Sequence, residues 1–192
     1  MTTERLTGRQ QGELLLPGAA IGLTAGFVAG VVAAFGGLHL GYVLGMAVGL
    51  GVPLAFAGAG YEALLASGRV RFSGIFPAAV FWLFAFPLAR VVHEFTLDML
   101  TGHLFALPDA LVPFLAYQAL ISTGFTVGFM WLHEHVAPVW WVKIAYRNPR
   151  AAEYVAVKLR QADRLQQTKQ KEKDKRDQKR KERREAGSGV GS

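Results

Sequence analysis

The chain of 192 residues contains no cysteine, which excludes disulfides, thiolate metal ligands and cysteine nucleophiles. It also has no formally charged residue at the 48 positions between Glu13 and Glu62. As a helix, this stretch would be roughly 72 Å long, whereas the hydrocarbon core of a bilayer is about 30 Å thick. The uncharged stretch therefore predicts two membrane spans rather than one.

Four apolar segments predict an all-α integral membrane protein with four transmembrane helices. The break in the uncharged stretch falls in the sequence FGGLHLG, where a glycine pair and a histidine interrupt it. The first span is longer than the roughly 7–15 apolar residues of a cleavable signal peptide, so we interpret it as a retained anchor. The expected spans are residues 15–35, 40–61, 72–92 and 110–132, within a transmembrane domain of residues 15–136.

The distribution of Lys and Arg predicts the orientation of these spans. The N-terminal arm, residues 1–14, contains Arg5 and Arg9, and the loop after the second span contains Arg69 and Arg71. The region after the fourth span is also basic, whereas the other two connections contain no Lys or Arg. By the positive-inside rule, we expect both termini in the cytoplasm and the chain in the cytoplasmic (inner) membrane of a bacterium.

Ionisable residues at the predicted outer end of the third span form a candidate site. Arg90 and Glu94 are four residues apart and share a helix face, with His93 beside them. Imidazole and carboxylate groups suit Zn²⁺ or Cu²⁺, and they also serve acid–base catalysis. The alternative is a set of paired, solvated residues at a helix exit. The candidate catalytic residues are His93, Glu94 and Arg90, and the candidate metal ligands are His39, His93, Glu94 and His103.

The His-Glu-His triplet at residues 133–135 is predicted to lie at the opposite, cytoplasmic interface. Residues two apart on a helix point about 200° apart, so the two histidines cannot both bind one ion on a continuous helix. We interpret the triplet as polar residues at the point where a helix leaves the membrane. Trp140, Trp141 and Tyr146 follow as expected anchors in the interfacial aromatic belt.

Glycines recur every four residues along the first two spans, a pattern that lets helix backbones approach closely in lipid. We expect these two helices to form a tight antiparallel hairpin. A stripe that faces away from the hairpin would offer a docking surface to another membrane protein. The seven glycines of the two stripes are Gly18, Gly22, Gly26, Gly30, Gly41, Gly45 and Gly49.

Residues 137–168 are expected to form an interfacial segment followed by a cytoplasmic amphipathic helix. Asn148 and Pro149 have the residue types of an N-cap and a first helical position. A narrow apolar stripe follows at spacings of three and four residues, a pattern suited to a partner or to the membrane surface. Its members are Ala152, Val155, Leu159 and Ala162.

The tail, residues 169–192, is dominated by charge. Residues 169–185 contain ten Lys or Arg and five Asp or Glu and have no apolar face, which indicates a solvated helix or a disordered tail. Its cations can fix topology, attract anionic lipid, or contact RNA or a ribosome through phosphates. The terminal sequence GSGVGS is typical of an engineered linker, and we give it no functional role.

The sequence contains no nucleotide-binding motif and no nucleophile elbow, and this favours a non-enzymatic role. We expect a small integral membrane subunit or accessory protein that packs against a larger membrane complex through its glycine-rich faces and its basic tail. One alternative is a membrane-embedded enzyme or metal-binding protein that uses the outer-face His/Glu cluster, with Zn or Cu as its metal. Another is a homo-oligomeric channel or transporter. Besides the bilayer, the expected partner is a membrane protein or a second copy of the chain.

Overall fold

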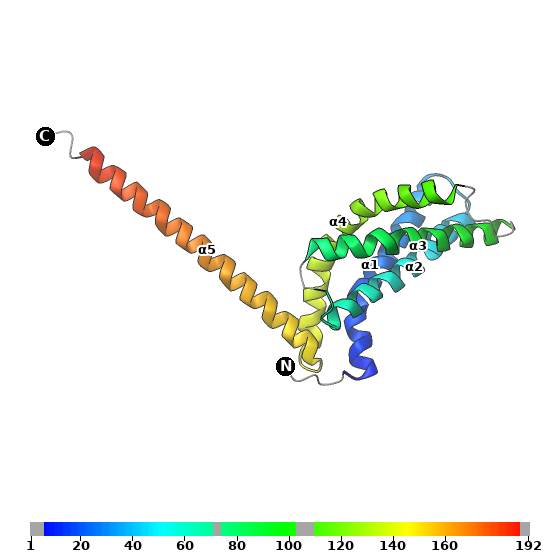
Figure 1. Ribbon diagram of the computed structural model, residues 1–192, viewed down its shortest axis with the longest axis horizontal. Helices are drawn as coiled ribbons and strands as arrows, with labels where there is room; N and C mark the ends of the chain where they lie inside the picture. The colour runs from blue at the N-terminus through cyan, green and yellow to red at the C-terminus, as the bar shows by residue number, and fades with distance from the viewer. Residues whose placement is uncertain (1–5, 71–73, 103–109, 189–192) are drawn as a thin grey trace.

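The computed structural model describes residues 6–70, 74–102 and 110–188, with side chains described as far as residue 179. Within these ranges the regular structure is helical, without strands (Figure 1). Four of the helices are long enough and apolar enough to cross a membrane, which gives the chain the character of a multi-pass membrane protein. The five helices are α1 (Gly8–Phe35), α2 (Leu40–Ala66), α3 (Ile75–Thr101), α4 (Leu111–Ile144) and α5 (Pro149–Ser188).

The apolar helices extend beyond the predicted spans. A capping box between Thr7 and Gln10 starts α1 at Gly8 rather than at residue 15. The helix α3 continues past residue 92 to Thr101. Gly102 ends it as a C-cap in the left-handed conformation, with a φ of 75°. An apolar run marks the thickness of the bilayer, whereas capping groups decide where the helix begins and ends.

The helices α1 and α2 form a tight antiparallel hairpin, and glycines lie where the two backbones approach each other. A Cβ atom added at Gly22 would lie 2.3 Å from the backbone of Leu54, and one added at Gly18 would lie 2.3 Å from the carbonyl oxygen of Gly58. Neither distance is compatible with a real side chain, so the close approach of the two backbones depends on these glycines.

The glycines of α2 divide between two neighbouring helices. Gly51 and Gly58 face α1, whereas Gly45 and Gly49 face α3, where Leu100 and Thr96 cover them. The predicted stripe of α2 therefore packs within the chain against α3 and not against α1. Gly41 contacts only the ring of His39.

An aromatic cluster fills the space between α2, α3 and α4. Trp82 of α3 is fully buried and packs against Phe125 and Phe129 of α4, with ring centroids 4.7 and 4.6 Å away. Tyr61 of α2 completes the cluster through Phe129, at 5.6 Å. Large rings supply much of the buried apolar area in the body of the bundle.

One end of the bundle, here called the junction end, gathers the start of α1, the end of α2 and the connection between α4 and α5. Gln10 of α1 donates a hydrogen bond to the carbonyl of Arg147, and Asn148 donates one to the carbonyl of Gln10. Arg150 donates two to the carbonyl of Ala66, the last residue of α2. These bonds connect three segments that are distant in sequence.

Candidate functional site

A buried pair of ionisable residues joins α2 to α4 near the junction end. Oε1 of Glu62 lies 2.8 Å from Nε2 of His133, and the two residues are 1% and 4% exposed. The side chain of Glu62 lies against Gly18, where an added Cβ would come within 2.8 Å of its Cγ atom. The pair thus needs a glycine on α1 as well as its two members.

Aromatic rings enclose this pair and exclude lipid and bulk water from it. His133 stacks on Phe129 and contacts Tyr61 and Trp141 edge-on, with ring centroids 5.9, 6.1 and 5.7 Å away. Trp141 in turn packs against Tyr154 of α5 at 4.8 Å. Burial raises the pKa of the Tyr154 hydroxyl above its usual range, and the nearby Arg150 opposes this only in part, so the hydroxyl stays protonated.

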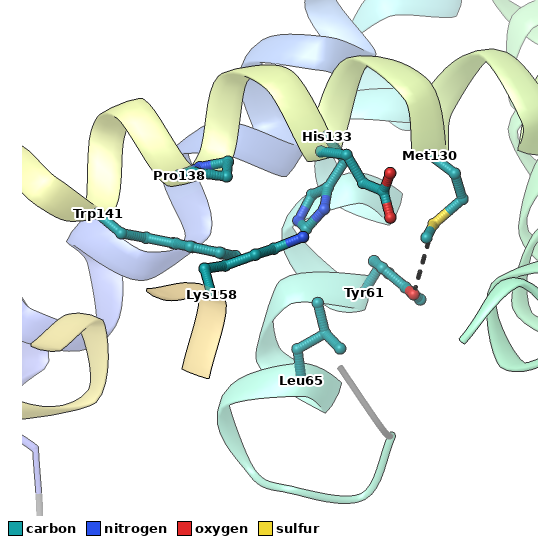
Figure 2. A pocket seen from close by; sticks show the side chains of 8 residues that line it. Tyr61, Leu65, Met130, His133, Pro138, Trp141 and Lys158 are labelled. Atoms are coloured by element: carbon teal, nitrogen blue, oxygen red, sulfur yellow. Dashed lines mark hydrogen bonds between the residues drawn. The ribbon is translucent and has the colours of Figure 1, made fainter. Parts of the chain in front are cut away.

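A cavity of about 10 Å³ adjoins His133, which is about the size that holds one water molecule. Figure 2 shows Lys158 of α5 reaching toward the imidazole ring, with Tyr61 on the other side of the cavity. The hydroxyl of Tyr61 donates to the sulfur of Met130 at 3.7 Å. Polar groups from α2, α4 and α5 therefore meet here, and the cavity is lined by Tyr61, Leu65, Met130, His133, Glu134, Pro138, Trp141 and Lys158.

Both members of this pair were expected at the cytoplasmic end of their spans, but their contact was not predicted. A shared membrane level is the only signal in the sequence that could have suggested the contact. His135, by contrast, is exposed and contacts the carbonyl oxygen of Trp131 through Nδ1, at 2.6 Å. The two histidines of the triplet thus have separate environments.

The second cluster of ionisable residues lies inside α3 rather than at its end. Arg90 is 15 residues from Ile75 and 11 from Thr101, roughly 22 Å and 16 Å along the helix axis. Its Nη2 donates to Oε1 of Glu94 at 2.5 Å, and its Nη1 contacts Nδ1 of His93. The candidate catalytic residues Arg90, His93 and Glu94 are therefore in mutual contact, in the interior of α3.

Burial differs sharply within this cluster. His93 is 1% exposed and lies against Gly49 of α2, and its Nε2 has no hydrogen-bond partner among the described residues. The side chains of Arg90 and Glu94 are 22% and 35% exposed at the side of the bundle. Ionisable residues in apolar helices are costly when they lie within a bilayer, and there they usually mark functional positions.

The register of α3 and α4 brings a further polar group to the level of His93. Trp82 contacts Phe129, and Phe86 contacts Phe125, as expected for antiparallel neighbours. Continued for two helical turns, this register places Gln118 of α4 at the level of His93. Gln118 is buried, as are Ser122 and Thr126 on the same face of α4.

The four metal-ligand candidates do not converge in the part of the chain that the structure describes. His39 caps α2, its Nδ1 accepting from the backbone N–H of Tyr42, and it is exposed. Gly49, next to His93, is nine residues along α2 from Leu40, roughly 13 Å from that end. His103 lies outside the described residues. Among the described residues, no group of three or more His, Asp or Glu could hold a metal ion.

The three predicted interface anchors have different surroundings. Trp141 is fully buried within the protein. Trp140 is half-buried and donates a hydrogen bond through Nε1 to the carbonyl of Glu13 at 2.7 Å. Tyr146 is exposed and accepts a hydrogen bond from Arg147. Trp141 thus packs inside the protein, next to the connection between α4 and α5, and the anchoring of Trp140 and Tyr146 in the aromatic belt stays a prediction.

From this connection α5 projects away from the bundle (Figure 1). Asn148 caps its first turn by accepting from the backbone N–H of Ala151, and Ala151 and Tyr154 are buried against the bundle. From Leu159 to Lys179 every side chain is exposed. This part of α5, here called the arm, is thus held firmly at its base and contacts nothing else within the described chain.

The fold and these sites define the class of protein, a helical protein with four candidate membrane spans and a projecting terminal helix. Comparisons with protein-family models, with curated proteins and with solved structures found no significant match.

Proposed function

We propose that the chain is a non-enzymatic membrane protein that acts as an accessory subunit, anchoring the α5 arm and presenting it to a partner. One observation carries this proposal: the base of α5 is fixed by packing and hydrogen bonds, yet the arm itself contacts no other part of the described chain. Most helical stability in proteins comes from tertiary packing, and the arm has none within the described chain. A fixed direction and a free surface are both useful for contact with another molecule.

The proposed orientation places the junction end and the arm in the cytoplasm. Arg9, Arg69, Arg147 and Arg150 all belong to segments that meet at the junction end. By the positive-inside rule, such a concentration of arginine favours the cytoplasmic side. This arrangement supports the expected orientation with both termini in the cytoplasm.

The glycine stripes are covered within the chain and are therefore less suited than the arm to bind a partner. Gly18, Gly22, Gly26 and Gly30 pack against α2, and Gly45 and Gly49 pack against α3. These faces are occupied within the chain, so the arm is the better supported contact surface.

Site-specific photo-crosslinking in native membranes tests the accessory role. A photoreactive amino acid at Leu165, which is 65% exposed on the arm, is expected to give one discrete adduct with a protein or a nucleic acid. The same group at Val32, 64% exposed on the apolar surface of α1, is the matched control and is expected to give lipid adducts only. An arm that crosslinks to nothing above the background of the unirradiated sample would overturn the proposal.

A second function, ion or proton conduction, is supported by the contact among Arg90, His93 and Glu94 inside an apolar helix and by Nε2 of His93, which has no hydrogen-bond partner among the described residues. The test is proton flux into liposomes that contain the purified protein and a pH-sensitive dye. The His93→Gln variant should abolish the flux, and the His39→Gln variant, altered at an exposed histidine, should not. Flux equal to that of protein-free liposomes would eliminate this function.

A further inference from the structure

Most cations of the arm lie on one side of the helix and most acids on the other, a separation that is not visible in the linear sequence. At about 100° per residue, the six cations between residues 169 and 179 cover roughly 200° of the helix circumference. The remaining sector contains Asp174, Asp177 and two glutamines, and only Glu172 lies among the cations. The interspersed acids therefore fall mostly on the opposite face. The six cations are Lys169, Lys171, Lys173, Lys175, Arg176 and Lys179.

Among the side chains that the structure describes, these cations form no ion pair. Asp174 instead accepts a hydrogen bond from Gln170 at 2.9 Å on the opposite face. Lys169, Lys173 and Arg176 surround a shallow hollow together with Glu172. The cationic sector thus presents an almost uncompensated positive surface.

The composition of the arm limits the kind of partner that this surface fits. A protein interface normally has buried aromatic or aliphatic residues at its centre, and a helix that lies on a membrane needs an apolar face. Between Thr168 and Lys179 there is no aromatic or aliphatic residue at all. A phosphate backbone requires neither, because cations alone provide most of the affinity for it.

The cations also lie far from the base of α5. Lys169 is 20 residues from Pro149, roughly 30 Å along the helix axis, and Figure 1 shows α5 leading away from the bundle. The cationic sector is therefore separate from the junction end.

We propose that the cationic sector of the arm binds the phosphate backbone of RNA without reading its sequence. This inference rests on the proposed accessory role of the arm and names the chemistry of its partner. Without aromatic residues the arm cannot stack on bases, so affinity should depend on charge and salt and hardly on sequence.

Fluorescence anisotropy of a labelled oligouridine of about 20 nucleotides, titrated with the full chain in nanodiscs of neutral lipid, tests the proposal. The expected Kd is on the order of 1–100 µM at physiological salt, as for other non-specific complexes. The slope of log Kd against log salt should be about 2–4, since each neutralised phosphate of a single strand contributes about 0.7. No change in anisotropy at low salt would overturn the proposal.

Two variants localise the contact. Replacing Lys169, Lys173 and Arg176 with Gln removes three cations and should reduce the salt slope by about 2 and weaken binding at least about tenfold at low salt. The matched control replaces Lys169 and Lys173 with Arg, which keeps the charge, and should leave Kd within about twofold. A slope unchanged in the Gln variant would show that the RNA binds elsewhere and would overturn the assignment.

The lipid composition of the nanodiscs decides between RNA and the membrane surface. We expect the same Kd for RNA in neutral discs and in discs with anionic lipid. A loss of RNA binding of tenfold or more in the anionic discs would assign the cations to headgroups and overturn the RNA proposal. The accessory role is judged separately, since a protein crosslinked at Leu165 would support that role even if RNA does not bind.

Discussion

His133 and Glu62 are 71 positions apart in the sequence, yet Nε2 of the first and Oε1 of the second lie 2.8 Å apart in a site closed to solvent. A buried hydrogen bond of this kind adds little net stability while it is intact, but it is costly to break on one side only. The pair therefore specifies which faces of α2 and α4 meet more than it adds to the stability of their contact.

Removing one member of this pair should destabilise the protein more than changing a neighbouring exposed residue. His133→Ala leaves the carboxylate of Glu62 buried without its donor, and we expect a loss of about 1–3 kcal/mol in the free energy of unfolding. His135→Ala, two positions away at an exposed side chain, is the control and should change it by less than about 0.5 kcal/mol. Unfolding in mixed micelles with increasing SDS measures both. Equal effects of the two substitutions would contradict a structural role of the pair.

The glycines of the hairpin provide a second prediction. Gly22→Ala adds a Cβ that would lie 2.3 Å from the backbone of Leu54, so α1 and α2 must separate, at a cost of about 1–3 kcal/mol. Gly124→Ala on α4 is the matched control, because nothing lies within 4 Å of the added atom. Alanine has the higher helix propensity, so the control should be neutral or stabilising by up to about 1 kcal/mol. The same unfolding assay compares them, and a neutral Gly22→Ala would show that the hairpin is looser than described.

These two cases show what the sequence could and could not predict. The four apolar helices followed from the length of the uncharged and apolar runs, because bilayer thickness sets a minimum length. The rotation of each helix did not follow, and Gly45 and Gly49 were expected in the hairpin but face α3. Spacing defines a helix face, whereas only packing against all neighbours decides which helix that face meets.

The candidate sites were harder to predict than the helices. Arg90 and Glu94 were correctly expected to be neighbours, since a spacing of four residues is a local property. Their position at the outer end of the membrane span stays a prediction, because α3 continues past them to Thr101 and the end of a helix does not mark the edge of the bilayer. The pairing of Glu62 with His133 depends on the tertiary fold, and no local pattern reports it.

A double-mutant cycle tests the ion pair within α3. Arg90→Leu leaves Glu94 without its partner on an apolar helix, and we expect a loss of about 2–3 kcal/mol, in line with the cost of an unpaired charge within a membrane span. The double variant Arg90→Leu, Glu94→Leu removes both charges and should be more stable than the single variant. Additive losses in the unfolding assay would mean that the two side chains act independently and that water or headgroups solvate each of them.

The direction of the arm depends on one residue of the connection between α4 and α5. Asn148 caps α5 through the N–H of Ala151 and donates from its side chain to the carbonyl of Gln10. Asn148→Ala removes both bonds, whereas Asn148→Asp keeps an oxygen for the cap but loses the donor to Gln10. We therefore expect the alanine variant to lose about 1 kcal/mol of stability from the missing cap and to loosen the base of the arm.

Pulsed electron spin resonance can measure this loosening, because the chain has no cysteine and two introduced cysteines label it uniquely. Gly12 and Leu165 are exposed positions on α1 and on the arm. The distance distribution between labels at these sites should be narrow in the parent protein and broad in Asn148→Ala. The aspartate variant should be intermediate, since its cap persists while the bond to α1 is lost. A parent distribution as broad as that of Asn148→Ala would mean that the arm has no fixed direction. Packing at Ala151 and Tyr154 would then be too weak to orient it.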